Sequence, residues 1–405
     1  MAGAPRRRPL SSWSDIPVEL AGLVLRRLPA HVDRVRFAAV CPQWRAATRQ
    51  DRLPPPLPLL AVPDGGAVYS VPRSERFRFP ACVGYDDACG NWMVFSNEDG
   101  CFLRDAFSNA TMTLPALSRA RLRHVGDEPV DETGLTWTEL DDGEGKKLTL
   151  RRLMFCSSHL VAAFVNFLGH GTRFAVCRPG PTSWWSVLMD AWFPLFFDMA
   201  FHQGKLYAID RDKGNLFCID VSMDHSTGDA WVPRIRQVID GVTSRPSKQP
   251  LMSIFGYSSM RMLYLVESSG LLLMVQRRTY GRFLSEIKGH PMERGRLTAT
   301  GQIDFAVFKA DFQMSRWTKV TTIGDDRVLF LQQRCSRSVC VSQCEMPGDC
   351  IVFIKNDDND SRFYNKESLS YCSVYDMSSG KISTYLPMVS WARVPVLATW
   401  LLPQN

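Results

Sequence analysis

Between residues 16 and 28, the apolar positions repeat with helical spacing. They lie three or four residues apart, which predicts a helix with one apolar face, and they are Ile16, Leu20, Leu23, Val24 and Leu28. Ser14 and Asp15 suit the N-cap of this helix, and Pro17 is tolerated in its first turn. Because proline cannot continue a helix, Pro29 should end it.

Two further short helices are expected before residue 50. The second begins near His31 or Asp33, and the chain restarts at Pro42 into a third helix that holds Trp44 and Ala47. Three helices in so few residues bury little surface by themselves. We therefore expect a partner to complete this small unit.

Beyond residue 60 the chain alternates short apolar and polar runs, punctuated by Gly, Asp, Asn and Ser. Three segments share one plan, in which a polar turn closing on glycine separates two apolar runs: residues 92–103, 205–221 and 262–275. A looser fourth copy spans residues 371–386. This plan is typical of β-hairpins.

The glycines of these four turns are spaced by multiples of about 56 residues, and they are Gly100, Gly214, Gly270 and Gly380. Turns missing from this series are expected near residues 157 and 325. A repeat of this length is typical of a β-propeller, whose blades are four-stranded sheets. We therefore predict a small all-α N-terminal unit followed by an all-β propeller of six blades, with seven as the alternative count.

A proline-rich stretch at residues 53–58 separates the helical pattern from the strand pattern. Proline stiffens such a connection, and its shortness favours a fixed arrangement of the two parts. We expect the helical unit over residues 11–50, a linker over 51–60 and the propeller over 61–405.

The net charge of +7 is concentrated at the N-terminus. Residues 1–52 hold ten arginines and four acidic residues, so the rest of the chain is almost neutral. A nucleic-acid-binding protein usually spreads basic residues over its largest domain, so we expect no nucleic-acid partner. The run Arg6-Arg7-Arg8 is either a solvated charge run or a nuclear signal.

No apolar run approaches the length of a membrane-spanning helix, and no apolar region follows the basic N-terminus. We therefore expect neither a membrane partner nor a secretory signal. The expected location is the nucleus, the cytoplasm or both.

The twelve cysteines include no CxxC pair. The densest group, Cys335, Cys340, Cys344 and Cys350, has gaps that match no familiar zinc site. We expect reduced, buried cysteines with no metal and no cofactor. Tryptophans near the ends of predicted strands are expected to be largely core residues, and they are Trp184, Trp185, Trp231, Trp317 and Trp391.

No catalytic motif is present: the seven histidines are scattered, and the chain lacks HExxH, GxSxG and a phosphate-binding glycine loop. His202 is expected to be a hydrogen-bonded strand or turn histidine, and the acidic run at residues 357–360 a solvated loop. We expect no enzyme activity. The alternative is a propeller with its own ligand or activity, which needs polar side chains converging on its axis.

The first fifty residues resemble an F-box, the motif that binds the Skp adaptor of SCF-type ubiquitin ligases. The resemblance rests on two anchor sequences at the usual separation, IPxEL at residues 16–20 and VCxxW at residues 40–44. It implies that ten residues bind the adaptor or support that surface: Trp13, Ile16, Pro17, Glu19, Leu20, Val24, Leu28, Val40, Cys41 and Trp44. The alternative is that these residues pack only against one another and the next domain.

The remaining chain resembles the plant family labelled domain of unknown function 295, which an F-box commonly precedes. The resemblance is carried by residues 198–210, 305–342 and 350–358, by SYCSVYDMSSGK and by residues 90–115. It implies a non-catalytic substrate receptor that binds a Skp-type adaptor and, through it, a Cullin, with an unknown target protein on the propeller. In the alternative reading, the F-box only regulates turnover of the protein.

Overall fold

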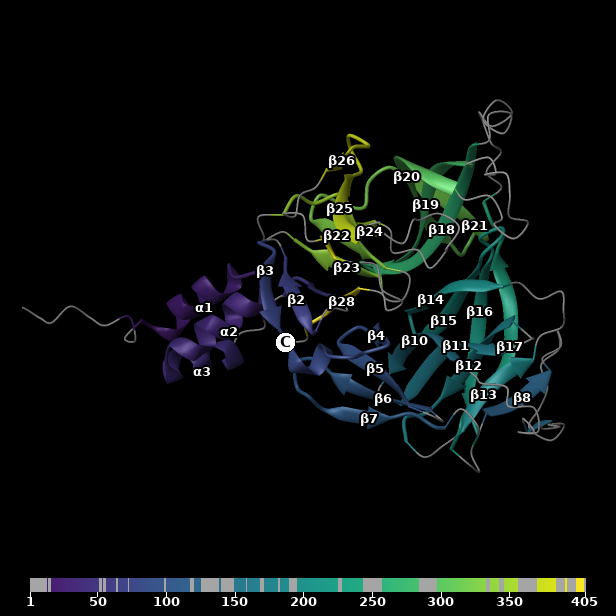
Figure 1. Ribbon diagram of the computed structural model, residues 1–405, viewed down its shortest axis with the longest axis horizontal. Coiled ribbons are helices and arrows are strands. Elements are labelled where there is room, and N and C mark those ends of the chain that lie inside the picture. Colours follow the sequence, from purple (N-terminus) through teal and green to yellow (C-terminus); the bar gives the residue numbers. More distant parts are fainter. Residues whose placement is uncertain are drawn as a thin grey trace, which may run out of the picture.

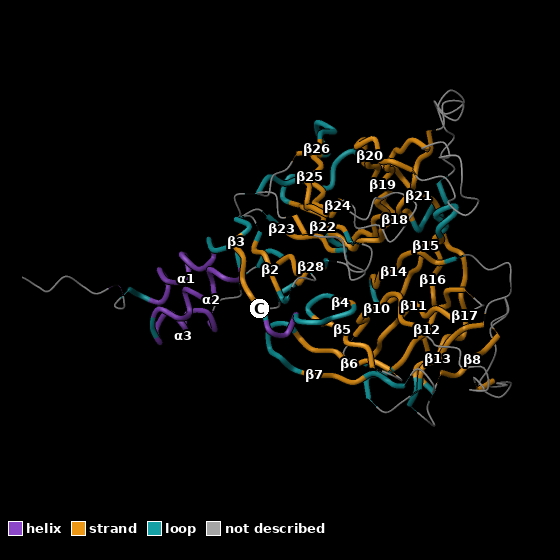
Figure 2. Tube along the Cα trace, viewed as in Figure 1, coloured by secondary structure: helices purple, strands orange, loops and turns teal. Residues whose placement is uncertain are grey.

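The structure is a computed structural model with a three-helix unit at one end of a ring of sheets (Figure 1). In the part of the chain that the structure describes, helices are confined to that end apart from one short turn, and strands make up the ring (Figure 2). The described residues are 13, 16–50, 53, 56–62, 65–71, 73–97, 100–116, 120–124, 138–139, 149–157, 159–167, 171–180, 183–188, 195–224, 228–242, 257–283, 297–332, 336–341, 346–355, 370–383, 390–391 and 398–403.

The helical unit consists of α1 (Val18–Arg26), α2 (His31–Val40) and α3 (Pro42–Gln50). This confirms the expected starts of the second and third helices. The first helix begins later than expected, because Pro17 is its N-cap residue and does not lie in its first turn. Pro17 has a ψ of 141°, which is extended backbone, and its carbonyl accepts the N–H of Ala21 at 3.1 Å. Ser14 and Asp15 lie outside the described residues.

Blades 1 to 3 follow the helical unit and the first three strands in chain order. Blade 1 contains β4 (Asp87–Cys89), β5 (Trp92–Asn97), β6 (Gly100–Asp105) and β7 (Thr111–Thr113). Blade 2 contains β10 (Thr149–Ser157), β11 (Leu160–Phe167), β12 (Gly171–Cys177) and β13 (Trp184–Leu188), extended by β8 (Ala120–His124) and β9 (Thr138–Glu139). Blade 3 contains β14 (Phe196–His202), β15 (Lys205–Asp210), β16 (Leu216–Met223) and β17 (Ala230–Ile239).

Blades 4 to 6 complete the ring. Blade 4 contains β18 (Tyr257–Ser268), β19 (Leu271–Phe283), β20 (Leu297–Asp311) and β21 (Arg316–Val320). Blade 5 contains β22 (Arg327–Leu331), β23 (Arg337–Cys340), β24 (Cys350–Lys355), β25 (Ser370–Asp376), β26 (Ile382–Ser383) and β27 (Ser390–Trp391). Blade 6 contains β28 (Thr399–Leu401), β1 (Leu59–Ala61), β2 (Ala67–Ser70) and β3 (Glu75–Arg78).

The described strands therefore form six sheets, which confirms the six-bladed propeller. Blade 6 closes the ring, because the last strand, β28, pairs antiparallel with β1 near the start of the propeller. Strand β1 begins at Leu59, inside the segment expected to be linker.

The 56-residue repeat predicted from the turn glycines does not match equivalent positions in successive blades. The turn at Gly100 joins the second and third strands of blade 1, whereas the turn at Gly270 joins the first and second strands of blade 4. The turn near residue 325 connects blade 4 to blade 5 and forms no hairpin within a blade. Each blade contains several tight turns, and a glycine with positive φ suits any of them, so turn glycines alone do not identify equivalent positions.

The hydrophobic core is divided among the junctions between neighbouring blades. Tryptophans link three of these junctions by donating an indole N–H to a carbonyl of the preceding blade or its connection: Trp184 to Pro115 at 2.8 Å, Trp317 to Gly214 at 2.9 Å and Trp400 to Leu331 at 3.2 Å. Trp185 and Trp231 are also buried, while the side chain of Trp391 lies outside the described part of the chain.

A buried ion pair joins the first strands of blades 2 and 3. Arg152 of β10 pairs with Asp198 of β14, and Asp198 also accepts the N–H of Leu265 in β18 at 2.9 Å. Burial raises the pKa of Asp198 to about 7, in spite of its cationic partner. The desolvation of this pair is therefore costly, and its contribution is to align three adjacent blades.

Candidate functional site

The helical unit has a small core of its own and leaves apolar side chains outside it. Its core consists of Ala21, Leu25, Phe37 and Ala47. On α1 the exposed fractions are 53% for Leu20, 55% for Leu23 and 48% for Val24, while Val40 at the end of α2 is 57% exposed. Their spacing on α1 is that of one helix face, so the three residues form a continuous apolar stripe.

The ten residues predicted from the F-box resemblance divide into two groups. Six are exposed: Trp13, Pro17, Glu19, Leu20, Val24 and Val40. Four are partly buried: Ile16, Leu28 and Trp44, which pack against the small core, and Cys41. The exposed set, together with Leu23, forms a largely apolar surface that faces solvent. The partly buried residues lie beneath this surface.

Trp44 supports this surface through contacts with both ends of the motif. Its ring stacks on Phe37 with a centroid separation of 4.4 Å. Its indole N–H donates to the carbonyl of Trp13 at 3.3 Å, and its backbone N–H points to the Cys41 sulfur at 3.4 Å. The VCxxW sequence thus holds the chain segment that precedes α1.

Leu23 was absent from the predicted site although it is as exposed as Leu20. The signal that could have found it is the helical spacing itself, since Leu23 lies three residues after Leu20.

Several contacts fix the helical unit on the propeller. The N–H of Leu57 donates to the carbonyl of Pro29 at 2.9 Å. Arg36 of α2 forms an ion pair with Glu75 of β3, and one N–O distance in this pair is 3.0 Å. His31 meets Phe107 edge to face, with ring centroids 4.9 Å apart. The short linker therefore joins two parts that are also in direct contact.

Four buried cysteines of the propeller have thiols of low reactivity. Burial raises the pKa of Cys82, Cys101, Cys156 and Cys372 to about 12. At neutral pH these thiols remain protonated, and a thiol is a poor metal ligand and a poor nucleophile. In the described part of the chain, no three His, Cys, Asp or Glu side chains are placed to hold a metal ion.

His202 differs from the expectation of a hydrogen-bonded histidine. It is the last residue of β14, and among the described residues its buried Nδ1 has no hydrogen-bond partner. Burial lowers the pKa of His202, and its ring lies nearly parallel to Phe312 with centroids 6.2 Å apart. Its contacts are those of a neutral packing residue at the edge of blade 3.

No described helix is both long enough and apolar enough to cross a membrane.

Relatives among known proteins are plant F-box proteins. F-box protein SKIP23 of Arabidopsis thaliana is 22% identical in an alignment that covers 94% of this chain and 93% of that protein. F-box protein At4g35733 of the same plant is 24% identical, covering 80% of this chain and 83% of that protein. F-box protein At2g26160 is 21% identical, covering 85% of this chain and 96% of that protein.

Among solved structures, the N-terminal domain of Nup159 matches 80% of this chain and 72% of that domain. The TM-score is 0.28 and the identity 8%, which are too low to support any argument.

These relatives confirm the expectation of a plant F-box protein with a propeller, whereas the label domain of unknown function 295 stays a prediction. Residues 59–376, most of the chain, match the family described as KIB1-4 beta-propeller. The matched region begins at the first residue of β1. The chain therefore belongs to the KIB1-4 beta-propeller family.

Proposed function

We propose that this protein is the substrate-recognition subunit of an SCF-type E3 ubiquitin ligase. The helical unit binds a Skp-type adaptor and, through it, a Cullin. The propeller binds the target protein, and the chain contributes no catalytic residue of its own. It works in the nucleus, the cytoplasm or both.

The observation that carries this proposal is the apolar stripe of α1. Leu20, Leu23 and Val24 are about half exposed, because the helical unit has too few residues to bury them itself. A helix that presents apolar anchors at this spacing is typical of a surface that lies in a partner's groove. Burying a leucine side chain fully is worth about 1.5–3 kcal/mol, so the stripe offers a few kcal/mol of binding free energy.

The contacts between the two parts of the chain suit a receptor that works by proximity. Because Arg36 and Leu57 join the helical unit to the propeller, an adaptor bound to α1 is held at a fixed distance from a target bound to the propeller. A target lysine held near a ubiquitin thioester reacts at a high effective concentration. A fixed geometry keeps that concentration high.

Co-purification tests this proposal directly. The full chain is expressed with a plant Skp-type adaptor and a Cullin, and complexes are isolated through a tag on the full chain. We expect both partners to co-purify with the wild type and to be lost from Pro17→Asp and Leu20→Asp. Aspartate is a preferred N-cap residue and suits the first turn of a helix, so neither change should unfold α1.

Leu195→Asp is the matched control. Leu195 lies on the propeller just before β14 and is 49% exposed, close to the value for Leu20. This variant should retain both partners. If the wild type bound neither partner, the proposal would be wrong, and the alternative of a propeller with its own ligand or activity would take its place.

A further inference from the structure

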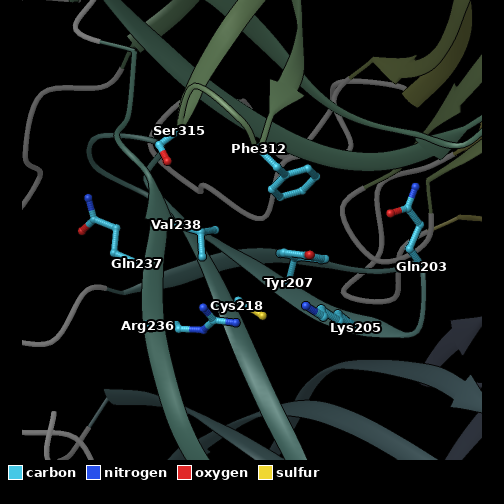
Figure 3. A pocket seen from close by; sticks show the side chains of 9 residues that line it. All are labelled: Gln203, Lys205, Tyr207, Cys218, Arg236, Gln237, Val238, Phe312 and Ser315. Atoms are coloured by element: carbon cyan, nitrogen blue, oxygen red, sulfur yellow. The ribbon is translucent and has the colours of Figure 1, made fainter. Parts of the chain in front are cut away.

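A pocket of about 510 Å³ lies between blades 3 and 4, away from the helical unit. Strands β15, β16 and β17 form one side, and the turn between β20 and β21 forms the other (Figure 3). Tyr207, Cys218 and Arg236 are aligned across the three strands of blade 3. Residues paired in this way project from the same face of a sheet, so they form a continuous floor.

The charged residues that line this pocket are both cationic. They are Lys205 and Arg236, and the amides of Gln203 and Gln237 lie beside them. Within the described residues Lys205 has no ion-pair partner, and Arg236 has only Asp220, at 3.8 Å. Burial raises the pKa of Tyr207 and Cys218, so neither adds negative charge at neutral pH.

An aromatic side chain, that of Phe312, lines the same pocket, and a second exposed apolar residue, Met314, lies on the adjoining turn. Phe312 lies above Tyr207 in Figure 3, and their ring centroids are 5.3 Å apart. Phe312 is 40% exposed and Met314, two residues further along the same turn, is 63% exposed. Exposed large apolar residues beside a polar pocket are characteristic of binding surfaces.

The turn that carries these apolar residues is held in place before any ligand arrives. The N–H of Met314 donates to the Asp311 carboxylate at 3.1 Å. Behind the turn, the indole of Trp317 donates to Gly214 of blade 3 at 2.9 Å. A surface ordered in advance loses less entropy when it binds.

We propose that this pocket and the adjoining turn bind a peptide segment of the target protein in which an anionic side chain lies next to an apolar one. The anionic group lies between Lys205 and Arg236, and the apolar side chain packs on Phe312 and Met314. The inference rests on the proposed function and names the class of target segment that the propeller takes. Carboxylate and phosphate share this anionic chemistry, and the test separates them.

The test selects peptides without knowing the target. The purified full chain is used to select binders from a phage-displayed library of short random peptides, and the enriched sequences are synthesised. We expect Asp or Glu adjacent to an aromatic or aliphatic residue. A fluorescent copy of the consensus peptide is then titrated with wild type, Lys205→Glu, Phe312→Ser and the control Lys381→Glu.

Lys205→Glu and Phe312→Ser should each weaken binding by about tenfold or more. Lys381 is exposed beside β26 of blade 5, so Lys381→Glu should bind as the wild type does. Replacing the acidic residue of the peptide by phosphoserine distinguishes a phosphate from a carboxylate as the anionic group. Tighter binding of the phosphopeptide indicates a phosphorylated target, and equal or weaker binding indicates a carboxylate.

Three results would overturn the inference: no enrichment, enriched peptides without an acidic residue, or equal binding by all variants. Adaptor binding is measured on the same preparations. If the wild type bound the adaptor but no peptide, only the proposed role of the pocket would be refuted. If the wild type did not bind the adaptor, the proposed function would be refuted.

Discussion

One buried amide, that of Gln332, links the last strand of the propeller to blade 5. Its Nε2 donates to the carbonyl of Ala398 at 2.7 Å. Its Oε1 accepts the Trp400 backbone N–H and the Thr399 hydroxyl, both at 3.0 Å. These bonds attach β28 to blade 5, while β28 pairs on its other side with β1, the strand that follows the linker. Closure of the ring and attachment of the helical unit are therefore connected.

Gln332→Leu keeps a similar volume and removes all three hydrogen bonds. It leaves an N–H, a carbonyl and a hydroxyl without this partner in surroundings where Gln332 itself is 2% exposed. Each such group costs about 1–3 kcal/mol, and since the costs are not additive we expect a total loss of about 3–6 kcal/mol. Urea unfolding followed by tryptophan fluorescence measures the free energy of unfolding.

Gln313→Leu is the matched control, because Gln313 is exposed at the turn between β20 and β21. It should change the free energy of unfolding by less than about 0.5 kcal/mol. If Gln332→Leu were as stable as this control, the closure would not depend on the buried amide and the reasoning would be refuted.

Three further predictions follow from other contacts. Asp198→Ala removes the carboxylate that neutralises the buried guanidinium of Arg152, so at pH 8 it should lower the free energy of unfolding by about 3–5 kcal/mol; replacing both partners by apolar residues should recover most of that loss. Arg36→Glu should speed hydrogen exchange at the Leu57 amide as the helical unit loosens, and adding Glu75→Arg should slow it again; unchanged exchange in the single variant would show that this ion pair does not hold the unit. Iodoacetamide should label partly exposed Cys41 before the buried cysteines, and the bound adaptor should protect it, as read by mass spectrometry.

The helical unit could be predicted well because its signals are local. The period of Leu20, Leu23 and Val24 shows which side of α1 is apolar, and Pro42 marks the start of α3. What the sequence could not show is how apolar residues divide between core and surface. Leu25 is buried and Val24 is about half exposed, and that division depends on the position of α3.

The propeller could be predicted in class and blade count, but not in its pairings. Strands β28 and β1 are each three residues long and are the last and first strands of the propeller in the sequence, so no local pattern shows that they pair. The tryptophans were expected in the core, yet their hydrogen bonds to carbonyls across blade junctions depend on tertiary placement. The pocket also depends on tertiary placement, because Lys205 and Phe312 come from different blades.

The central claim is that α1 binds a Skp-type adaptor, and the affinity of the full chain for the purified adaptor tests it most directly. Isothermal titration calorimetry of the wild type, Leu20→Asp and Leu195→Asp gives three dissociation constants. We expect micromolar or tighter binding by the wild type and by Leu195→Asp, and binding weakened by about 100-fold or more in Leu20→Asp, because a charge would enter the apolar contact. No binding by the wild type, or equal affinity for Leu20→Asp and Leu195→Asp, would contradict the account.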